Sequence, residues 1–235
     1  MLRGYQMIDA DGHVIEPVDL WETRLEPELR ALVSPPQPGD TSSIYRDKAM
    51  PIDASLHLID MRRQVELHYK EFLDAGWGPE SQLKAMDEMG IDMAFLYPTS
   101  GLGKWSEEGM VPGLAAALAR AYNEWLYEFS SYEPKRLMPV AGIGLNDSES
   151  SVQQLHRTVN DLGIRAVVLP PTPSNARLSD PAYKSFWAEC ERLGVSVGIH
   201  GSSYTPVAHT GQDRFNTRFA LQWCADFHLR REFPK

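Results

Sequence analysis

Hydrophobic and polar residues follow two periods along this chain, one typical of helices and one typical of short buried strands. Three stretches share one pattern: MDEMGIDMAFLYP, VNDLGIRAVVLPP and ERLGVSVGIHG. In each, a helix-like end is followed by a glycine, which accepts the left-handed backbone that closes a helix, and then by a short apolar run. Together with the first apolar stretch and LMPVAGIGL, these runs predict strands at about 6–13, 91–98, 137–145, 164–170 and 195–200.

Helical patterns fill the intervals between the predicted strands. Apolar side chains recur at helical spacing after Pro112, and again after Asn146-Asp147-Ser148, a favourable sequence for a helix start. Ser179-Asp180-Pro181 opens a further helix, with the proline in its first turn. Strands that alternate with helices predict a parallel sheet with helical crossovers, so the predicted fold class is α/β.

The number of strands leaves two architectures open. A closed (β/α)8 barrel of the TIM type needs eight strands, whereas this sequence predicts five. The chain is therefore either a different, open α/β sheet or a TIM-type barrel truncated after about five or six βα units. Residues 34–80 break the alternation with a turn-rich loop and a short helix, RRQVELHYKEFLDAGW. We interpret them as an insertion in a single domain spanning 1–235; in a barrel it would lie over the active face as a partial cap.

Composition and charge exclude several classes of partner. The chain has 235 residues, a hydrophobic fraction of 43% and a formal net charge of -9, without a basic run. This charge argues against binding to nucleic acid or to an anionic membrane surface. No apolar stretch is long enough to span a bilayer or to serve as a secretory signal. The two cysteines, Cys190 and Cys224, form no CxxC pattern, and we expect core thiols in a reducing compartment, the cytoplasm.

Candidate chemistry lies at the ends of two predicted strands. Strict alternation in IDADGHV puts Asp9, Asp11 and His13 on one strand face, and alternation in VSVGIH puts His200 on the face of the small residues Ser196 and Gly198. Catalytic groups of a (β/α) barrel gather at the carboxyl ends of its strands. Carboxylate and neutral imidazole are good ligands for zinc, manganese or iron. The pattern therefore predicts that Asp11, His13 and His200 converge on one point.

The alternative to a metal site is a structural one. A lone histidine at a strand end, such as His200, is more often hydrogen-bonded than ligating, and Asp9 could cap a turn. The combination Asp-x-Asp-x-His is more specific, because no structural role requires three polar residues on one strand face. Other cofactor signals are weak: GLGKWSEEG lacks the spacing of a phosphate-binding loop, and no Gly-x-Ser-x-Gly motif indicates a serine hydrolase.

The opening IDADGHVIEPVDLWE resembles amidohydrolase-related proteins of the branch that includes aminocarboxymuconate semialdehyde decarboxylase and the aromatic-acid decarboxylases. MDEMGIDMAFLYP, LGIRAVVLPP and LGVSVGIH resemble that branch in order and spacing. The resemblance implies a (β/α)8 barrel with a divalent metal, zinc in many members and manganese or iron as alternatives. It implies metal ligands at Asp11, His13 and His200, with His200 also a catalytic residue. Asp9 matches the aspartate that commonly precedes the ligand pair.

The sequence departs from the family pattern in two places. Where members have another histidine near the sixth strand, this chain has Thr217, and His209 matches only loosely. The late aspartate of the family, a metal ligand and acid/base, has no counterpart. We therefore expect a truncated barrel, with unpaired strand edges that favour a homo-oligomer.

Three functions follow from this resemblance. The leading one is metal-dependent, non-oxidative decarboxylation of a small aromatic or unsaturated carboxylic acid. The second is metal-dependent hydrolysis of a C–N or C–O bond, in which the metal activates a water molecule. The third is a catalytically inactive, truncated barrel. The first two share their ligands, and the sequence does not separate them.

Overall fold

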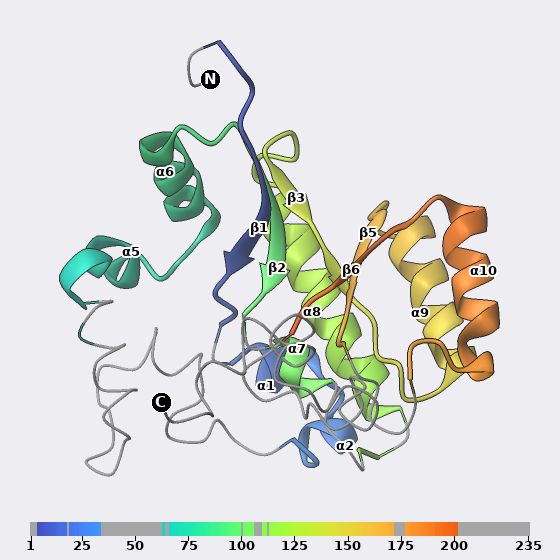
Figure 1. Cartoon of the computed structure of the whole chain (residues 1–235). Coiled ribbons are helices and arrows are strands. Elements are labelled where there is room, and N and C mark those ends of the chain that lie inside the picture. Colours follow the sequence, from blue (N-terminus) through green and yellow to red (C-terminus); the bar gives the residue numbers. More distant parts are fainter. Residues whose placement is uncertain are drawn as a thin grey trace, which may run out of the picture.

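The computed structural model describes residues 4–17, 19–33, 63, 66–99, 101–105, 110–111, 113–171 and 177–201. Its strands are β1 (Ile8–Val14), β2 (Met93–Pro98), β3 (Leu137–Pro139), β4 (Ala141–Gly142), β5 (Ala166–Leu169) and β6 (Ser196–Ile199). Its helices are α1 (Leu20–Arg24), α2 (Pro27–Arg30), α5 (Lys70–Asp74), α6 (Pro79–Met89), α7 (Gly101–Lys104), α8 (Leu114–Ser130), α9 (Ser148–Asn160) and α10 (Lys184–Leu193), with a 3-10 turn at Pro181–Tyr183. Figure 1 labels most of these elements.

All strands are parallel and follow chain order. They form two three-stranded sheets, β1-β2-β3 and β4-β5-β6. Only Val140 separates β3 from β4, and its N–H donates to the carbonyl of Leu96 on β2. Five predicted strand positions are thus confirmed, in an α/β fold with parallel sheets. Among the described residues, β1 pairs only with β2 and β6 only with β5, so no closed barrel is present there.

One predicted strand has a different form in the structure. The segment predicted as a single strand at about 137–145 is divided into β3, which pairs with β2, and β4, which pairs with β5. Tilted strands in a curved sheet are staggered, so the first half of a strand faces one neighbour and the second half faces the next. The segment therefore changes partners along its length and carries two short ladders instead of one.

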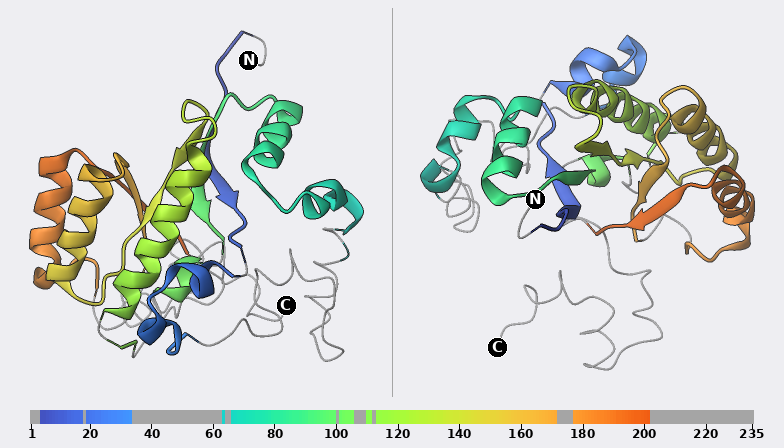
Figure 2. Two further views of the ribbon diagram at one scale, coloured as in Figure 1. Left: turned by 180° about the vertical axis from the view of Figure 1, so that it is seen from behind. Right: turned by 90° about the horizontal axis from the view of Figure 1, so that it is seen from above.

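The six strands follow one another in a curved row, called the arc below, and helices cover its outer side. Seen from above, α8, α9 and α10 lie along one side of the strands (Figure 2), and α6 contributes the buried side chain of Met86 to the core. One core cluster joins α8 to the buried side chains of β1, β2 and β3, among them Val14, Leu96 and Leu137. A second joins α9 and α10 to β4 and β5, through Leu155, Phe186 and Val167.

The predicted helix ends agree with the structure. Gly90, Gly163 and Gly194 all have positive φ, as their places after α6, α9 and α10 require. Asp147 caps α9 by accepting the N–H of Ser150 at 2.7 Å. In the insertion predicted at 34–80, α5 lies within the expected helical segment, and 34–62 lie outside the described residues. No helix in the described ranges combines the length and the apolar composition needed to cross a bilayer.

The buried thiol of Cys190 should resist alkylation. Cys190 is free and 4% exposed, and burial is the main cause that raises its pKa to about 11. Because the thiolate is the reactive form, a thiol with that pKa is only about one part in a thousand ionised near pH 8. We expect iodoacetamide to leave Cys190 unmodified in the native protein and to modify it in urea. Peptide mapping by mass spectrometry separates it from Cys224, which lies outside the described residues. Equal rates in both states would contradict the burial.

Candidate metal centre

A β-bulge near the start of the chain sets the orientation of the candidate ligands. Asp9 pairs with Ala94 and Gly12 with Leu96, so β1 carries one more residue than β2 between these pairs. The carboxylate of Asp9 accepts the N–H of Asp11 at 3.0 Å, which stabilises the extra residue. The prediction that Asp9 shares one face with Asp11 and His13 was wrong, because the bulge interrupts the alternation. Asp9 supports the backbone of Asp11 instead.

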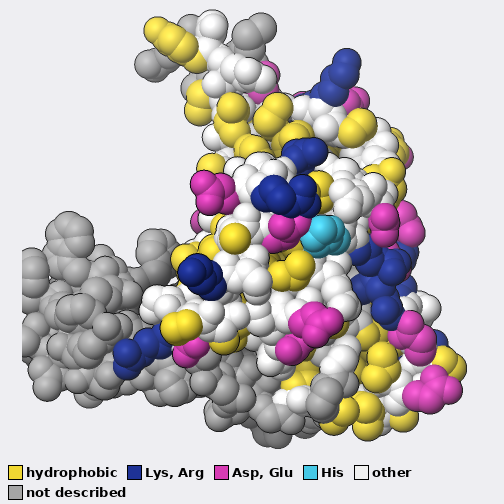
Figure 3. Space-filling view, turned by 90° about the vertical axis from the view of Figure 1, so that its right-hand side faces the viewer, with side chains coloured by type: hydrophobic (Ala, Val, Ile, Leu, Met, Phe, Trp, Pro, Cys, Tyr) yellow, Lys and Arg dark blue, Asp and Glu magenta, His cyan; other side chains and the backbone are white. Residues whose placement is uncertain are grey.

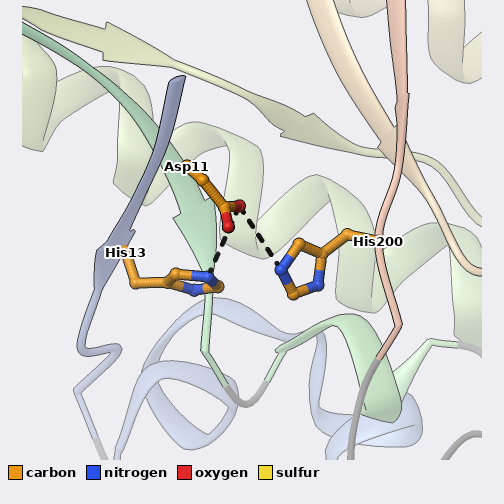
Figure 4. A group of neighbouring side chains, drawn as sticks. All are labelled: Asp11, His13 and His200. Carbon is orange, nitrogen blue, oxygen red and sulfur yellow. Dashed lines mark ion pairs between the residues drawn. The ribbon is translucent and has the colours of Figure 1, made fainter. Parts of the chain in front are cut away.

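The side chains of Asp11, His13 and His200 lie together (Figure 4). Asp11 and His13 project from β1, and His200 directly follows β6. Asp11 Oδ1 lies 3.4 Å from His200 Nε2 and 3.9 Å from His13 Nε2. The two imidazole centroids are 5.0 Å apart at 70°. One possible ligand atom from each residue lies within 4.8 Å of the others. The structure thus brings these three predicted residues to one point.

A backbone carbonyl determines which nitrogen His13 presents. His13 Nδ1 lies 3.0 Å from the carbonyl oxygen of Pro98, at the end of the neighbouring strand β2. Because a carbonyl only accepts, Nδ1 is the protonated nitrogen and donates this hydrogen bond. The lone pair of the neutral ring is then on Nε2, which faces Asp11. Metal-ligating histidines in proteins are oriented in the same way, by a hydrogen bond from their other nitrogen.

The donor set suits a divalent cation. Two imidazole nitrogens and one carboxylate oxygen are accepted by zinc, manganese and iron. Tetrahedral ligands at about 2.1 Å from a zinc ion are separated from one another by about 3.4 Å. In the structure, Asp11 Oδ1 lies 3.4 and 3.9 Å from the two histidine nitrogens, close to this value. The Asp11 side chain is 69% exposed, so a cation held there would keep positions open to solvent or substrate.

Burial and charge favour the neutral form of His13. Burial is the largest cause that lowers the pKa of His13, and the neighbouring His200 lowers it further. Asp11, the Pro98 carbonyl and Asp9 act in the opposite direction without reversing the shift. A lowered pKa keeps the imidazole unprotonated, as metal ligation requires.

This shift predicts how the stability of the metal-free protein depends on pH. The unfolded chain has the ordinary histidine pKa, 6.5, and the folded chain a lower one. The unfolded state therefore binds more protons as the pH falls through 6.5, so stability is present above that value and is lost toward the folded pKa. We expect the free energy of unfolding, from urea denaturation, to fall between about pH 7.5 and pH 5.5. The fall should be smaller in His13→Gln, and equal slopes in both proteins would contradict the shift.

Two further residues, one beside the cluster and one in the loop that follows β1, were not predicted from the sequence. Tyr97 pairs with His13 across β1 and β2, and its ring centroid lies 5.6 Å from that of His200. Glu16 is 2% exposed and accepts the N–H groups of Thr99 and Gly101 with one carboxylate oxygen, at 3.1 and 2.8 Å. It joins the loops that follow β1 and β2. The alternation along β2 could have placed Tyr97 on the strand face opposite to the buried residues Ala94 and Leu96, together with Phe95.

The structure describes two further histidines, His68 and His156, and neither belongs to the cluster. His156 forms an ion pair with Glu189 at 2.7 Å between α9 and α10. On that side of the molecule, acidic and basic side chains lie close together (Figure 3). His68 is exposed, ahead of α5. His57, His209, Asp213 and Thr217 lie outside the described residues. They therefore add nothing to the described geometry of the cluster.

Parallel strands with outer helices, and a carboxylate and two imidazoles at the carboxyl ends of β1 and β6, define an α/β protein with a candidate metal centre. The family model described as amidohydrolase matches residues 8–231. The chain belongs to the amidohydrolase family.

Two curated relatives cover only part of the chain. The chain is 26% identical to 2-amino-3-carboxymuconate-6-semialdehyde decarboxylase of Dictyostelium discoideum over 156 residues, 66% of this chain and 41% of the relative. It is 29% identical to gamma-resorcylate decarboxylase of Rhizobium radiobacter over 137 residues, 54% of this chain and 40% of the relative. The matched segments therefore span less than half of each relative's length.

Two solved structures share the fold. An amidohydrolase from Mycobacterium avium subsp. paratuberculosis has a TM-score of 0.61 at 19% identity, covering 95% of this chain and 65% of its own. Dihydroxybenzoic acid decarboxylase from Polaromonas sp., solved with manganese and the inhibitor 2-nitroresorcinol, has a TM-score of 0.53 at 19% identity. That match covers 88% of this chain and 53% of the decarboxylase.

Proposed function

We propose that this protein is a divalent-metal-dependent enzyme that decarboxylates a small aromatic or unsaturated carboxylic acid without an oxidant. The observation that carries the proposal is the convergence of Asp11, His13 and His200, from two strands that lie in separate sheets. Family membership and decarboxylases among the relatives favour this reaction over hydrolysis. In this proposal the three residues hold the metal, and His200 is also a catalytic residue.

The residues of the site have separable roles in this proposal. Asp11, His13 and His200 would hold a divalent metal, which would supply a Lewis acid that stabilises negative charge developing on the substrate. Asp11 supplies the anionic ligand and lowers the positive charge of the site. His13 is held in one tautomer by the carbonyl of Pro98, so it needs no reorientation on binding. In the reaction, the bond between the substrate carbon and its carboxylate would break, carbon dioxide would leave, the bonding electron pair would stay on that carbon, and a proton from solvent would be added to it.

We further propose that the five strand positions are consecutive members of a (β/α)8 barrel within a single domain, and that residues 34–80 are an insertion in it. Three features support this: the parallel order, the helices on one side, and polar groups at the carboxyl ends on the other. The bound metal is zinc or manganese in this proposal. Elemental analysis of protein grown with each metal distinguishes the two.

The proposed reaction is tested with protein freed of metal and reloaded with zinc or manganese. The probes are 2,6-dihydroxybenzoate and related hydroxybenzoates carrying ¹³C in the carboxylate, assayed for labelled carbon dioxide. We expect release only from the reloaded protein, with loss on chelation and recovery when metal is returned. Incorporation of ¹⁸O from water into product, without carbon dioxide, would show hydrolysis instead. Metal-loaded protein that releases no carbon dioxide from any of these acids would overturn the proposal.

A further inference from the structure

The three clustered side chains come from strands that share no hydrogen bonds. Asp11 and His13 belong to the sheet β1-β2-β3, and His200 follows the last strand of the sheet β4-β5-β6. Backbone pairing fixes the distance between adjacent strands, at about 4.8 Å, but not the distance across the arc from β1 to β6. Something other than the strand ladders must therefore set the spacing between Asp11 and His200.

The side chain of Tyr97 lies between the β1 residue His13 and the strand β6. It is in register with His13, and its ring centroid lies 6.2 Å from that of His13 and 5.6 Å from that of His200. At its far end, the hydroxyl oxygen reaches Gly198 on β6: a Cβ built on Gly198 would lie 2.7 Å from it. Gly198 is two residues before His200 and faces the same side of the strand. Tyr97 thus extends from the strand next to one ligand pair to the strand that carries the other ligand.

Position 198 needs a glycine because Tyr97 leaves no room for a side chain there. The backbone conformation at this position does not itself require glycine. Gly198 is absent from the residues with positive φ, so an alanine could adopt its conformation. The added methyl group would also lie 3.2 Å from Cε1 and 3.4 Å from Cζ of Tyr97. The hydroxyl oxygen is therefore the closest obstacle to an alanine, which would require a shift of the tyrosine or of β6, whereas Cε1 would have to give way by only a few tenths of an ångström.

We propose that Tyr97 and Gly198 are a pair of positioning residues that sets the separation of β1 and β6, and thereby the affinity and geometry of the site formed by Asp11, His13 and His200. This inference rests on the proposed metal-dependent function. Tyr97 acts as a spacer beside the ligands, and Gly198 provides the room in which its hydroxyl ends. Neither residue is a ligand in this proposal.

The pair is tested by a double-mutant cycle read out by metal binding without substrate. The proteins are the unsubstituted chain, Gly198→Ala, Tyr97→Phe and the combination of both substitutions. The probe is Co²⁺, whose affinity and visible absorption report the number and arrangement of ligands. We expect Gly198→Ala to weaken binding about tenfold or more and to change the spectrum, as loss of supporting contacts around metal ligands typically does. Tyr97→Phe alone should change affinity by less than about threefold.

The combined variant decides between positioning and general destabilisation. Removing the hydroxyl removes the 2.7 Å contact, so the combination should recover affinity to within about threefold of the unsubstituted protein and restore its spectrum. Gly78→Ala is the matched control, since a methyl group there meets no atom within 4 Å. If Gly198→Ala left the affinity unchanged, or if the combined variant did not recover affinity, the proposed positioning role of Tyr97 and Gly198 would be wrong. The proposed function would not be affected. Absence of Co²⁺ binding in the unsubstituted protein would overturn both.

Discussion

His200→Ala is expected to lower the affinity for a divalent metal by at least about 100-fold and to reduce carbon dioxide release to the background rate. The substitution removes one of three possible ligands, and it is the only one of them that lies outside β1. The remaining candidate ligands, Asp11 and His13, both belong to β1, so they would bind a cation from one side only. Metal content after dialysis and the ¹³C carbon dioxide assay measure the two effects.

The control for this prediction is another histidine. His156→Ala removes an imidazole that forms an ion pair with Glu189 between α9 and α10. Neither residue belongs to the candidate metal centre. This variant should retain metal and activity, because a partly exposed ion pair contributes little to stability. Circular dichroism establishes that both variants are folded. Retention of metal by folded His200→Ala at the original affinity would refute the assignment of this residue as a ligand.

Trp105→Ala is expected to destabilise the protein by about 3–5 kcal/mol, the range for removal of a large aromatic side chain from a core. Trp105 is fully buried and packs against Tyr122, with ring centroids 5.2 Å apart. Its ring fills the space beside two glycines: a Cβ on Gly142 would lie 2.3 Å from the indole, and one on Gly101 would lie 2.6 Å from it. Because these two glycines have no side chains, neither can extend into the cavity that alanine would leave.

Urea denaturation followed by circular dichroism measures this effect, and Trp105→Phe provides the graded comparison. The indole N–H has no hydrogen-bond partner among the described residues, so phenylalanine loses volume but no hydrogen bond. It should therefore cost less than alanine. A change below about 1 kcal/mol in Trp105→Ala would mean that the core around Gly142 relaxes to fill the space.

The order of strands and helices could be predicted because it depends on local sequence. A glycine such as Gly90 or Gly194 ends a helix through its own backbone, and the apolar run that follows is buried whatever lies beside it. The convergence of His13 and His200 followed from the same reasoning, since parallel strands bring their carboxyl ends to one edge. These features need no knowledge of which strands are neighbours.

Features that depend on partners could not be predicted. The bulge in β1 appears only when Asp9 and Gly12 are placed against Ala94 and Leu96, and one additional residue is enough to turn Asp9 away from the ligands. Likewise, the tautomer of His13 is set by the carbonyl of Pro98, which is distant in sequence. Reading one strand by itself gives the faces of its residues, but not the irregularities that pairing imposes.

The position of the clustered residues in the chain has a consequence for folding. Asp11 lies near the beginning of the described chain and His200 near its end, so the contact between them closes a loop that contains almost the entire fold. Contacts of such high sequence separation form late, because the loop entropy is lost before they contribute. A metal ion can bind there only when every intervening strand is in place. Its apparent affinity therefore falls as the fraction of incompletely folded molecules rises. Metal uptake would therefore report completed assembly of the arc, including the effects of substitutions far from the three residues.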